Sequence, residues 1–505
     1  MMDAVTRSGE STGVEKGWSP RLILSLVSMV LLLEMLAVSY SMVSMAIADI
    51  SAHFHTTQGA WLMTSMLLVG AVTGPLAGKL ADMYGKRKLL LGCAAVAAVG
   101  ALLSAVASSY AVLIVGRSLT GLLIPCVFLS YSLIRDIFPR KTVALAVSVA
   151  TSGMGLVAIP APFLTGWFLD NYGWRSIFWF FAIGLVVFGA MIFVSTEESA
   201  VRLRSKVDVL GAVLLGAGIA GVLVALSFGP TWGWQNGSTL AYLFGGSVLM
   251  VAWLVSAGFV SAPLIDLAVL RRRPVWLTAL VSGLCYACSA LFAMLLPMLA
   301  MTPAVMGLGY GFGISAKGFA IFQSPMAAMT MVGGVIVGAL VGRGIRPRPL
   351  LAGGMALISA AFVLCGQMHD NKALLMAFAG LCGTGMGLAM SAVPNLLIEA
   401  VPPQLQASTA SIVAVSQSVV ASILPVIVFT VLNNSYIAPF PMEMTHGHTF
   451  YTDNGFRIAF LMGAVAAGVA ALFALLLPRK IEQVRVPRTQ VAGDDDQQAA
   501  VAFAH

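Results

Sequence analysis

The chain has 505 residues, of which 59% are hydrophobic and 10% are charged, and its formal net charge is +8. Soluble domains usually carry about 25% charged residues, so a single water-soluble globule could not bury this much apolar surface. The composition therefore argues against a soluble enzyme and favours a chain that is solvated mainly by lipid.

A helix that crosses a bilayer needs about 20 apolar residues. Fourteen such stretches, separated by short polar loops, predict an all-α polytopic membrane protein. In chain order the predicted spans are 22–47, 59–78, 89–107, 110–134, 142–168, 175–194, 208–229, 239–261, 275–300, 314–341, 349–366, 373–398, 408–432 and 456–477. The polar tails 1–21 and 479–505 flank them, and we expect no cleavable signal peptide and a disordered C-terminal tail.

Lysine and arginine are concentrated at the two termini and in alternate loops, which accounts for the positive net charge. The positive-inside rule then predicts that both termini are cytoplasmic. The expected location is the plasma membrane. Because the charge is divided among short loops, no nucleic-acid partner is expected.

The first span contains one ionisable residue, Glu34, near its centre. An ionised carboxylate at that depth costs several kcal/mol if it has no partner, and intramembrane acids commonly carry protons or ions. Val30, Val38, Ser41 and Met45 share its side of the helix. The alternative is a protonated glutamic acid that holds a neighbouring helix through a hydrogen bond.

Two loops resemble each other at an offset of 260 residues. Gly78 matches Gly338, and Lys86 matches Arg346. The match indicates two six-helix halves, 22–194 and 266–478, with an inserted helix pair in 195–265. Duplicated halves around a site at mid-membrane are a recurrent transporter design.

The loop "GKLADMYGKRK" resembles the signature between the second and third helices of the major facilitator superfamily. The matching residues are Gly78, Asp82, Gly85, Lys86 and Arg87. In this family the loop acts in gating, and we expect Arg135, at the inner end of the fourth span, to pair with Asp82. The alternative is an ordinary basic loop.

Two further segments are similar to superfamily motifs. "LIVGRSLTGLL" carries Arg117 and Gly121 where the family has them, with Thr120 in place of the usual glutamine. Arg117 is expected to face the cavity and tune a carboxylate, unless it snorkels to the interface.

The segment "SGMGLVAIPAPFLTGW" resembles the bend-forming antiporter motif of the fifth helix. The residues that match the motif are Gly153, Gly155, Pro162 and Gly166, and Pro160 is additional to the family pattern. Ala161 and Thr165 stand where the family has glycines. Proline in a spanning helix removes a backbone hydrogen bond and permits a bend.

With fourteen spans, the chain resembles the subfamily of drug:proton antiporters that have an inserted central hairpin. Relatives carry an aspartate in the outer half of the first span, whereas this chain has Ser39 there and Glu34 five residues earlier. The resemblance implies that spans one, four, nine and twelve line a central cavity. The candidate substrate contacts are Met42, Met45, Tyr286, Ser391 and Asn395.

The expected function is proton-coupled export of a small lipophilic or amphipathic compound by alternating access, with Glu34 carrying the proton and Arg117 tuning it. The partners are then the substrate and membrane lipid, the unit is a monomer, and the proton is the coupling ion, with no other cofactor. The alternatives are a proton-coupled importer of the same fold and a membrane receptor or scaffold. The H-x-H pairs at His53 and His446 are expected to be loop histidines rather than metal ligands.

Overall fold

The computed structural model describes residues 18–56, 61–152, 160–202, 207–260, 263–264, 267–302, 310–314, 316–433, 435 and 451–478. Their regular structure consists of α-helices and one short 3₁₀-helix. The helices of the first half are α1 (Pro20–His53), α2 (Trp61–Tyr84), α3 (Lys86–Ala105), α4 (Tyr110–Thr120), α5 (Leu123–Ile137), α6 (Arg140–Ser152), α7 (Ala161–Tyr172) and α8 (Arg175–Ser195). The central pair is α9 (Val209–Trp232) and α10 (Gly237–Phe259). The second half comprises α11 (Leu267–Leu270), α12 (Arg273–Met301), α13 (Ala316–Gly342), α14 (Pro347–Gln367), α15 (Lys372–Ala400), η3 (Pro403–Leu405), α16 (Gln406–Asn433) and α18 (Asp453–Leu475).

The predicted all-α polytopic architecture is confirmed. Among the described residues, 13 helical segments are long and apolar enough to cross a membrane, with α4 and α5 forming one of them. The span expected at 142–168 falls on α6 and α7, and residues 153–159 between these helices lie outside the described ranges. The first span is longer than expected, because α1 runs from Pro20 to His53.

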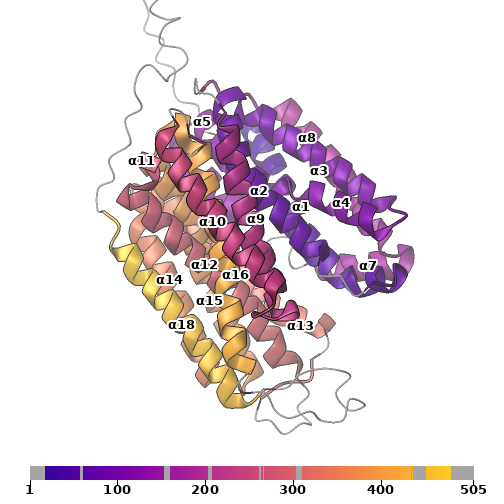
Figure 1. Ribbon diagram of the computed structural model, residues 1–505. Helices are drawn as coiled ribbons and strands as arrows, with labels where there is room; N and C mark the ends of the chain where they lie inside the picture. The colour runs from indigo at the N-terminus through magenta and orange to yellow at the C-terminus, as the bar shows by residue number, and fades with distance from the viewer. Residues whose placement is uncertain are drawn as a thin grey trace, which may run out of the picture.

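The helices gather into an N-terminal and a C-terminal group. Figure 1 shows helices α1, α3, α4, α7 and α8 of the first half on one side and helices α14, α15 and α18 of the second half on the other. We call the end that carries the α2–α3, α5–α6 and α13–α14 loops the basic end, because lysine and arginine are concentrated there. The other is the opposite end.

The fourth span is broken rather than continuous. Gly121 and Leu122 form a turn between α4 and α5. A Cβ on Gly121 would lie 2.4 Å from the Met66 carbonyl oxygen, and one on Gly70 would lie 2.8 Å from the Gly121 carbonyl oxygen. The two glycines therefore let α2 cross this break at backbone contact, as small residues do at helix crossings in membranes.

The glycines that the repeat pairs, Gly78 and Gly338, occupy equivalent crossings between the two halves. A Cβ on Gly78 of α2 would lie 2.8 Å from the carbonyl oxygen of Ala407 in α16. A Cβ on Gly338 of α13 would lie 2.9 Å from Cα of Leu145 in α6. Each half thus presses one glycine against a helix of the other.

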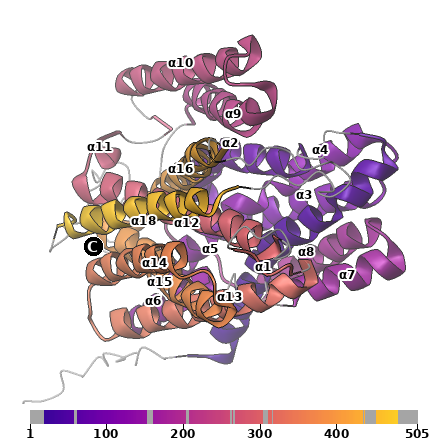
Figure 2. The same ribbon diagram turned by 90° about the horizontal axis from the view of Figure 1, so that it is seen from below.

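The inserted pair α9–α10 packs on the outside of the bundle. Figure 2 shows it at one edge, next to α2 and α16. Its inner face joins a cluster that includes Leu215, Leu223 and Trp253 with Ala71 of α2. Asp208 caps α9 by accepting from the Gly211 amide at 2.7 Å, and it also accepts from the Leu264 amide at 3.3 Å. One buried carboxylate thereby ties the two ends of the insertion together.

Substitution of Gly338 tests the crossing between α13 and α6. Gly338→Ala should lower the melting temperature of the purified protein, because a methyl group would overlap the α6 backbone and overpacking costs about 1–3 kcal/mol. Gly78→Ala should act alike at the α2–α16 crossing. The measurement is tryptophan fluorescence during heating.

The matched control for this test is Gly342→Ala in the same helix, where an added Cβ meets nothing within 4 Å. This variant should keep or raise the melting temperature, because alanine is favoured over glycine in a helix. Equal effects of Gly338→Ala and Gly342→Ala would show that the crossing does not depend on a bare backbone.

Candidate functional site

Asp82, near the C-terminal end of α2, binds the first turn of α16 in the other half. Its Oδ1 accepts from the Ala407 amide at 3.2 Å, and its Oδ2 accepts from the Ser408 amide at 2.9 Å and the Ser408 hydroxyl at 2.7 Å. The first amides of a helix have no partner within the helix, and the helix dipole favours negative charge there. A buried carboxylate of one half therefore caps a helix of the other.

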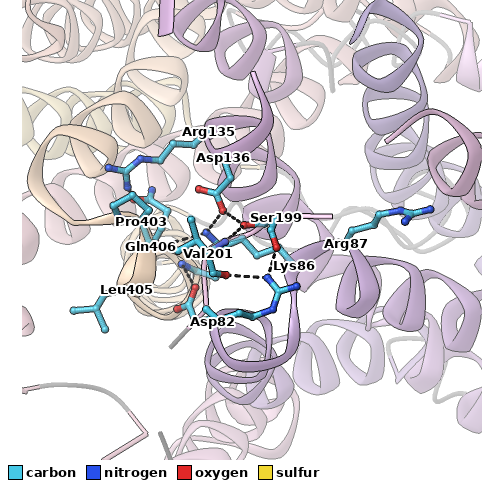
Figure 3. A network of polar contacts seen from close by, with 12 residues as sticks. Asp82, Lys86, Arg87, Arg135, Asp136, Ser199, Val201, Pro403, Leu405 and Gln406 are labelled. Carbon is cyan, nitrogen blue, oxygen red and sulfur yellow. Dashed lines mark hydrogen bonds and ion pairs between the residues drawn. The ribbon is translucent and has the colours of Figure 1, made fainter. Parts of the chain in front are cut away.

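Lys86, the first residue of α3, forms a buried ion pair in the same place. Its Nζ lies 2.6 Å from Oδ2 of Asp136 and donates to the Pro403 carbonyl at 3.1 Å. Asp136 also accepts from the Ser199 hydroxyl at 2.5 Å. A buried charge needs such partners, and removing one partner of a buried pair costs about 3–5 kcal/mol. Figure 3 shows these contacts converging beside Asp82.

Arg135 was expected to pair with Asp82, but its hydrogen bonds go elsewhere. Its guanidinium donates to the Val401 carbonyl at 2.7 Å and to the Gln406 side chain, both in the C-terminal half. Figure 3 shows it turned toward Pro403 and Gln406. The expectation was wrong because backbone amides of α16 occupy the carboxylate. Arg135 instead makes a second bridge between the halves, and we call Asp82, Lys86 and Arg135 with these partners the latch.

The segment after α8 closes over the latch. The carboxylate of Glu198 accepts from the amides of Arg87 and Lys88, each at 3.0 Å, and so caps α3. Gly85 precedes this cap with φ of 124°, and a Cβ there would lie 2.8 Å from the Glu198 carboxylate. Glycine is required at this position both for its conformation and for the space.

Arg87 points away from the latch. Figure 3 shows its side chain turned to the other side of the α3 start. It donates to the Phe193 carbonyl and its guanidinium lies 5.0 Å from the centre of the Phe193 ring. Arg87 therefore secures the end of α8 and does not bridge the halves.

Sequence reasoning missed Asp136, Glu198, Ser199 and Ser408. The available signals were the acid directly after Arg135 and the acidic pair at 197–198 among basic loops. The amide of Ser408 left no signal in the sequence, because most residues there would offer the same backbone donor, and its hydroxyl, which also donates to Asp82, was not singled out.

Ser391 and Asn395 of α15, proposed as substrate contacts, meet α6 of the other half. Both are buried. Asn395 Nδ2 donates to the Ser148 hydroxyl at 3.3 Å, and Thr151 donates to the Ser391 hydroxyl at 3.3 Å. In this conformation they belong to a polar contact between the halves.

The other proposed contacts differ in exposure. Met42 is buried, Tyr286 is half-buried and Met45 is 39% exposed. On α12, one turn from Tyr286, Ser282 accepts from Gln417 of α16 at 2.6 Å. Of the three candidates, Met45 is the most accessible.

Arg117 is fully buried where the fourth span breaks. Its guanidinium donates to Ser39 Oγ at 2.8 Å, to the Leu62 carbonyl at 3.2 Å and to Met66 Sδ at 3.0 Å. It does not snorkel to a surface. Ser39 thus supplies a neutral acceptor to this arginine.

Glu34 is 1% exposed in the middle of α1. On the same face Val38 is buried, and Val30 and Ser41 are half-buried. The carboxyl group therefore lies inside the bundle and does not face lipid, as the sequence predicted from its position in the apolar run.

The residues of the proposed bend are only partly described. Gly153 and Gly155 lie outside the described residues, as do His446 and His448. Pro160 precedes α7, which contains Pro162 and Gly166, and a Cβ on Gly166 would meet nothing within 4 Å. The Thr165 hydroxyl donates a hydrogen bond to the Ala161 carbonyl at 2.6 Å.

A groove of about 560 Å³ lies between α7 and α8 at the opposite end. Its lining residues are Trp167, Phe168, Tyr172, Arg175, Ser176, Trp179, Phe180 and Ile183. Trp167, Tyr172 and Trp179 are exposed. Aromatic side chains gather at the membrane interface in this way, so the groove has the character of a lipid-facing belt.

The chain matches curated transporters over most of its length. It is 28% identical over 409 residues to the multidrug resistance protein Stp of Mycobacterium tuberculosis, covering 79% of this chain and 74% of that protein. It is 27% identical over 447 residues to a multidrug resistance protein B homolog of the same species, covering 83% and 78%. The multidrug transporter protein MdtP of Bacillus subtilis is 25% identical over 65% of this chain and 60% of that protein.

Solved structures share the fold at low identity. The human organic anion transporter MFSD10 has a TM-score of 0.62 and 12% identity, with 90% of this chain and 100% of that chain covered. The proton:xylose symporter XylE also has a TM-score of 0.62, with 13% identity and 91% and 96% covered. The model of the Major Facilitator Superfamily matches residues 27–425. The chain therefore belongs to the Major Facilitator Superfamily and is a multi-pass membrane transporter rather than an enzyme.

Proposed function

We propose that this protein is a proton-coupled exporter of small lipophilic or amphipathic compounds, of the fourteen-helix drug:proton antiporter type. It would work as a monomer in the plasma membrane with both termini cytoplasmic, and the proton would be its coupling ion. The observation that carries this proposal is Glu34, an acid with 1% exposure midway along α1.

The depth of Glu34 makes it suited to exchanging a proton. An ionised carboxylate at mid-membrane is costly. Whether Glu34 is ionised would therefore depend on which other molecules occupy the cavity. A proton moving inward gains about 2.3 kcal/mol per 100 mV of membrane potential. If proton and substrate bind competitively, this gain drives substrate outward.

The latch supports alternating access. Its contacts join the halves at the basic end, where Asp82 caps α16 and Arg135 reaches Val401. We infer that this conformation is closed at the basic end, and that opening there breaks these bonds in exchange for new ones at the opposite end.

The substrate class follows from the relatives and from the cavity candidates. Several relatives are named as multidrug proteins. In the proposed substrate cavity, Met45 is accessible and Tyr286 half-buried, and such side chains adapt to varied apolar ligands. Arg117 would hold Ser39 and the α4–α5 break in position near this cavity.

The alternative is a proton-coupled importer. The specific observation in its favour is Thr165, which replaces a glycine of the antiporter motif and is buried with its hydroxyl on the helix backbone. Transport direction distinguishes the two functions.

The first test measures the sign of proton movement. Purified protein is reconstituted in liposomes without a pH gradient, ethidium or tetraphenylphosphonium is added outside, and luminal pH is followed with a trapped dye. An exporter by antiport should make the lumen more alkaline whichever way the protein is inserted. Acidification would show symport and overturn the proposed direction.

Glu34→Gln in the same assay should reduce substrate-driven proton flux at least about tenfold, because a glutamine amide neither takes up nor releases a proton in this pH range. Glu34→Asp should retain part of the flux. The matched control is Glu197→Gln, since Glu197 is exposed and its ion pair within the described ranges is with Arg21 at 2.7 Å. Unchanged flux in Glu34→Gln would remove Glu34 from the coupling mechanism.

Asp82→Asn tests the latch. The amide replaces one acceptor oxygen with a donor that opposes the α16 amides, so the basic end should open more often. Spin labels at Tyr84 and Arg343, both exposed and in different halves, should then show a longer distance population by double electron–electron resonance.

The six native cysteines are buried, which directs labelling to the introduced pair. Asp49→Asn, at the exposed far end of α1, is the control and should leave the distance distribution unchanged. The role of Asp82 in closure would be refuted by a distribution identical to that of the unsubstituted protein.

A further inference from the structure

A second titratable group is buried far from Glu34, at the opposite end of the C-terminal half. His369 lies in the connection between α14 and α15 and is 1% exposed. Its Nε2 is 2.5 Å from Oδ1 of Asp453, the first residue of α18, and its Nδ1 is 3.1 Å from the Cys365 carbonyl oxygen. The imidazole thus joins the end of α14 to the start of α18.

Both ring nitrogens face oxygen acceptors. A neutral histidine has one N–H and one lone pair, so it satisfies only one of these two contacts. Satisfying both requires one additional proton, carried either by the ring as an imidazolium or by the carboxyl group of Asp453. The geometry of His369 and Asp453 therefore corresponds to a pair that has bound a proton.

Two features of the structure around Asp453 stabilise negative charge on its carboxyl group. Asp453 is in the first turn of α18, where the helix dipole favours negative charge. Its Oδ2 lies 2.9 Å from Nε of Arg457, one turn along the helix. With His369 protonated, the Asp453 carboxylate would have a cation on each side.

Several other ionisable groups belong to the described parts of the chain around the pair. Asp370 and Lys372, on the same connection as His369, are exposed. Tyr310 covers α18 and donates to the Tyr451 carbonyl at 2.6 Å. Burial raises the pKa of Tyr310, so it stays neutral near pH 7.

We propose that His369 and Asp453 form a proton-binding site, separate from Glu34, that fastens the start of α18 to the α14–α15 connection. When the proton is lost, the neutral ring has one N–H for two oxygen acceptors. One of the two hydrogen bonds is then lost, and the contact between α18 and the α14–α15 connection weakens. The site therefore responds to the pH at the opposite end of the protein. This inference concerns proton binding alone and does not rest on the proposed transport function.

The test is nitrogen-15 NMR of the full-length protein in lipid nanodiscs, with all six histidines labelled. The difference between wild type and His369→Gln assigns the signal. At about pH 6 we expect protonation of both ring nitrogens of His369, or a protonated carboxyl on Asp453 in a matching carbon-13 spectrum. One protonated nitrogen beside an ionised Asp453 from about pH 5 to 8 would overturn the proposal.

Two further variants keep the result interpretable. Asp453→Asn keeps the shape and removes the charge, so His369 should lose its second proton at a lower pH. Arg457→Gln removes the competing cation, so His369 should hold that proton to a higher pH. If neither change moves the titration of His369, the ring does not share a proton with Asp453.

Stability provides an independent measurement if the NMR signal cannot be assigned through His369→Gln. The folded protein binds the extra proton, so its contribution to stability is greatest at low pH and is lost as pH rises. The melting temperature of wild type relative to Asp453→Asn should therefore be higher at about pH 6 than at about pH 8. A constant difference would count against the site.

Discussion

The closed basic end depends on one interaction, in which the Asp82 carboxylate caps the first turn of α16. The interaction satisfies two requirements at once. A buried carboxylate needs donors, and the first amides of a helix need acceptors. Neither group finds what it needs within its own half. The two halves therefore complete each other at this point, and Lys86 and Arg135 strengthen the junction through carbonyl groups of the C-terminal half.

The same requirement explains the other polar groups inside the bundle. Arg117 is buried and distributes its donors over a hydroxyl, a carbonyl and a thioether. Ser391 and Asn395 direct their side chains to Ser148 of the other half. Hydroxyl and amide contacts of this kind are weak individually, about 1 kcal/mol or less in membranes. They can be exchanged between conformations at little cost, whereas an ion pair at the same place would resist separation.

The sequence was sufficient to predict the helical architecture, the repeat and the burial of Glu34, because each depends on hydrophobic runs or on glycine spacing. The pairing of Gly78 with Gly338 was visible as a weak match and proved to mark two equivalent crossings. The partners of Asp82 were not predictable, because two of its three donors are backbone amides, which leave no trace in a sequence, and the third is the Ser408 hydroxyl. The break at Gly121 was also missed, since the apolar run continues through it without interruption.

The α8–α9 linker carries part of the latch. Ser199 donates a hydrogen bond to the Asp136 carboxylate, and Glu198 caps α3 directly beside Lys86. Both residues follow the last helix of the N-terminal half and precede the inserted pair in the chain. A shortened protein that lacks α9 and α10 would therefore need to keep residues 195–202 to retain these contacts.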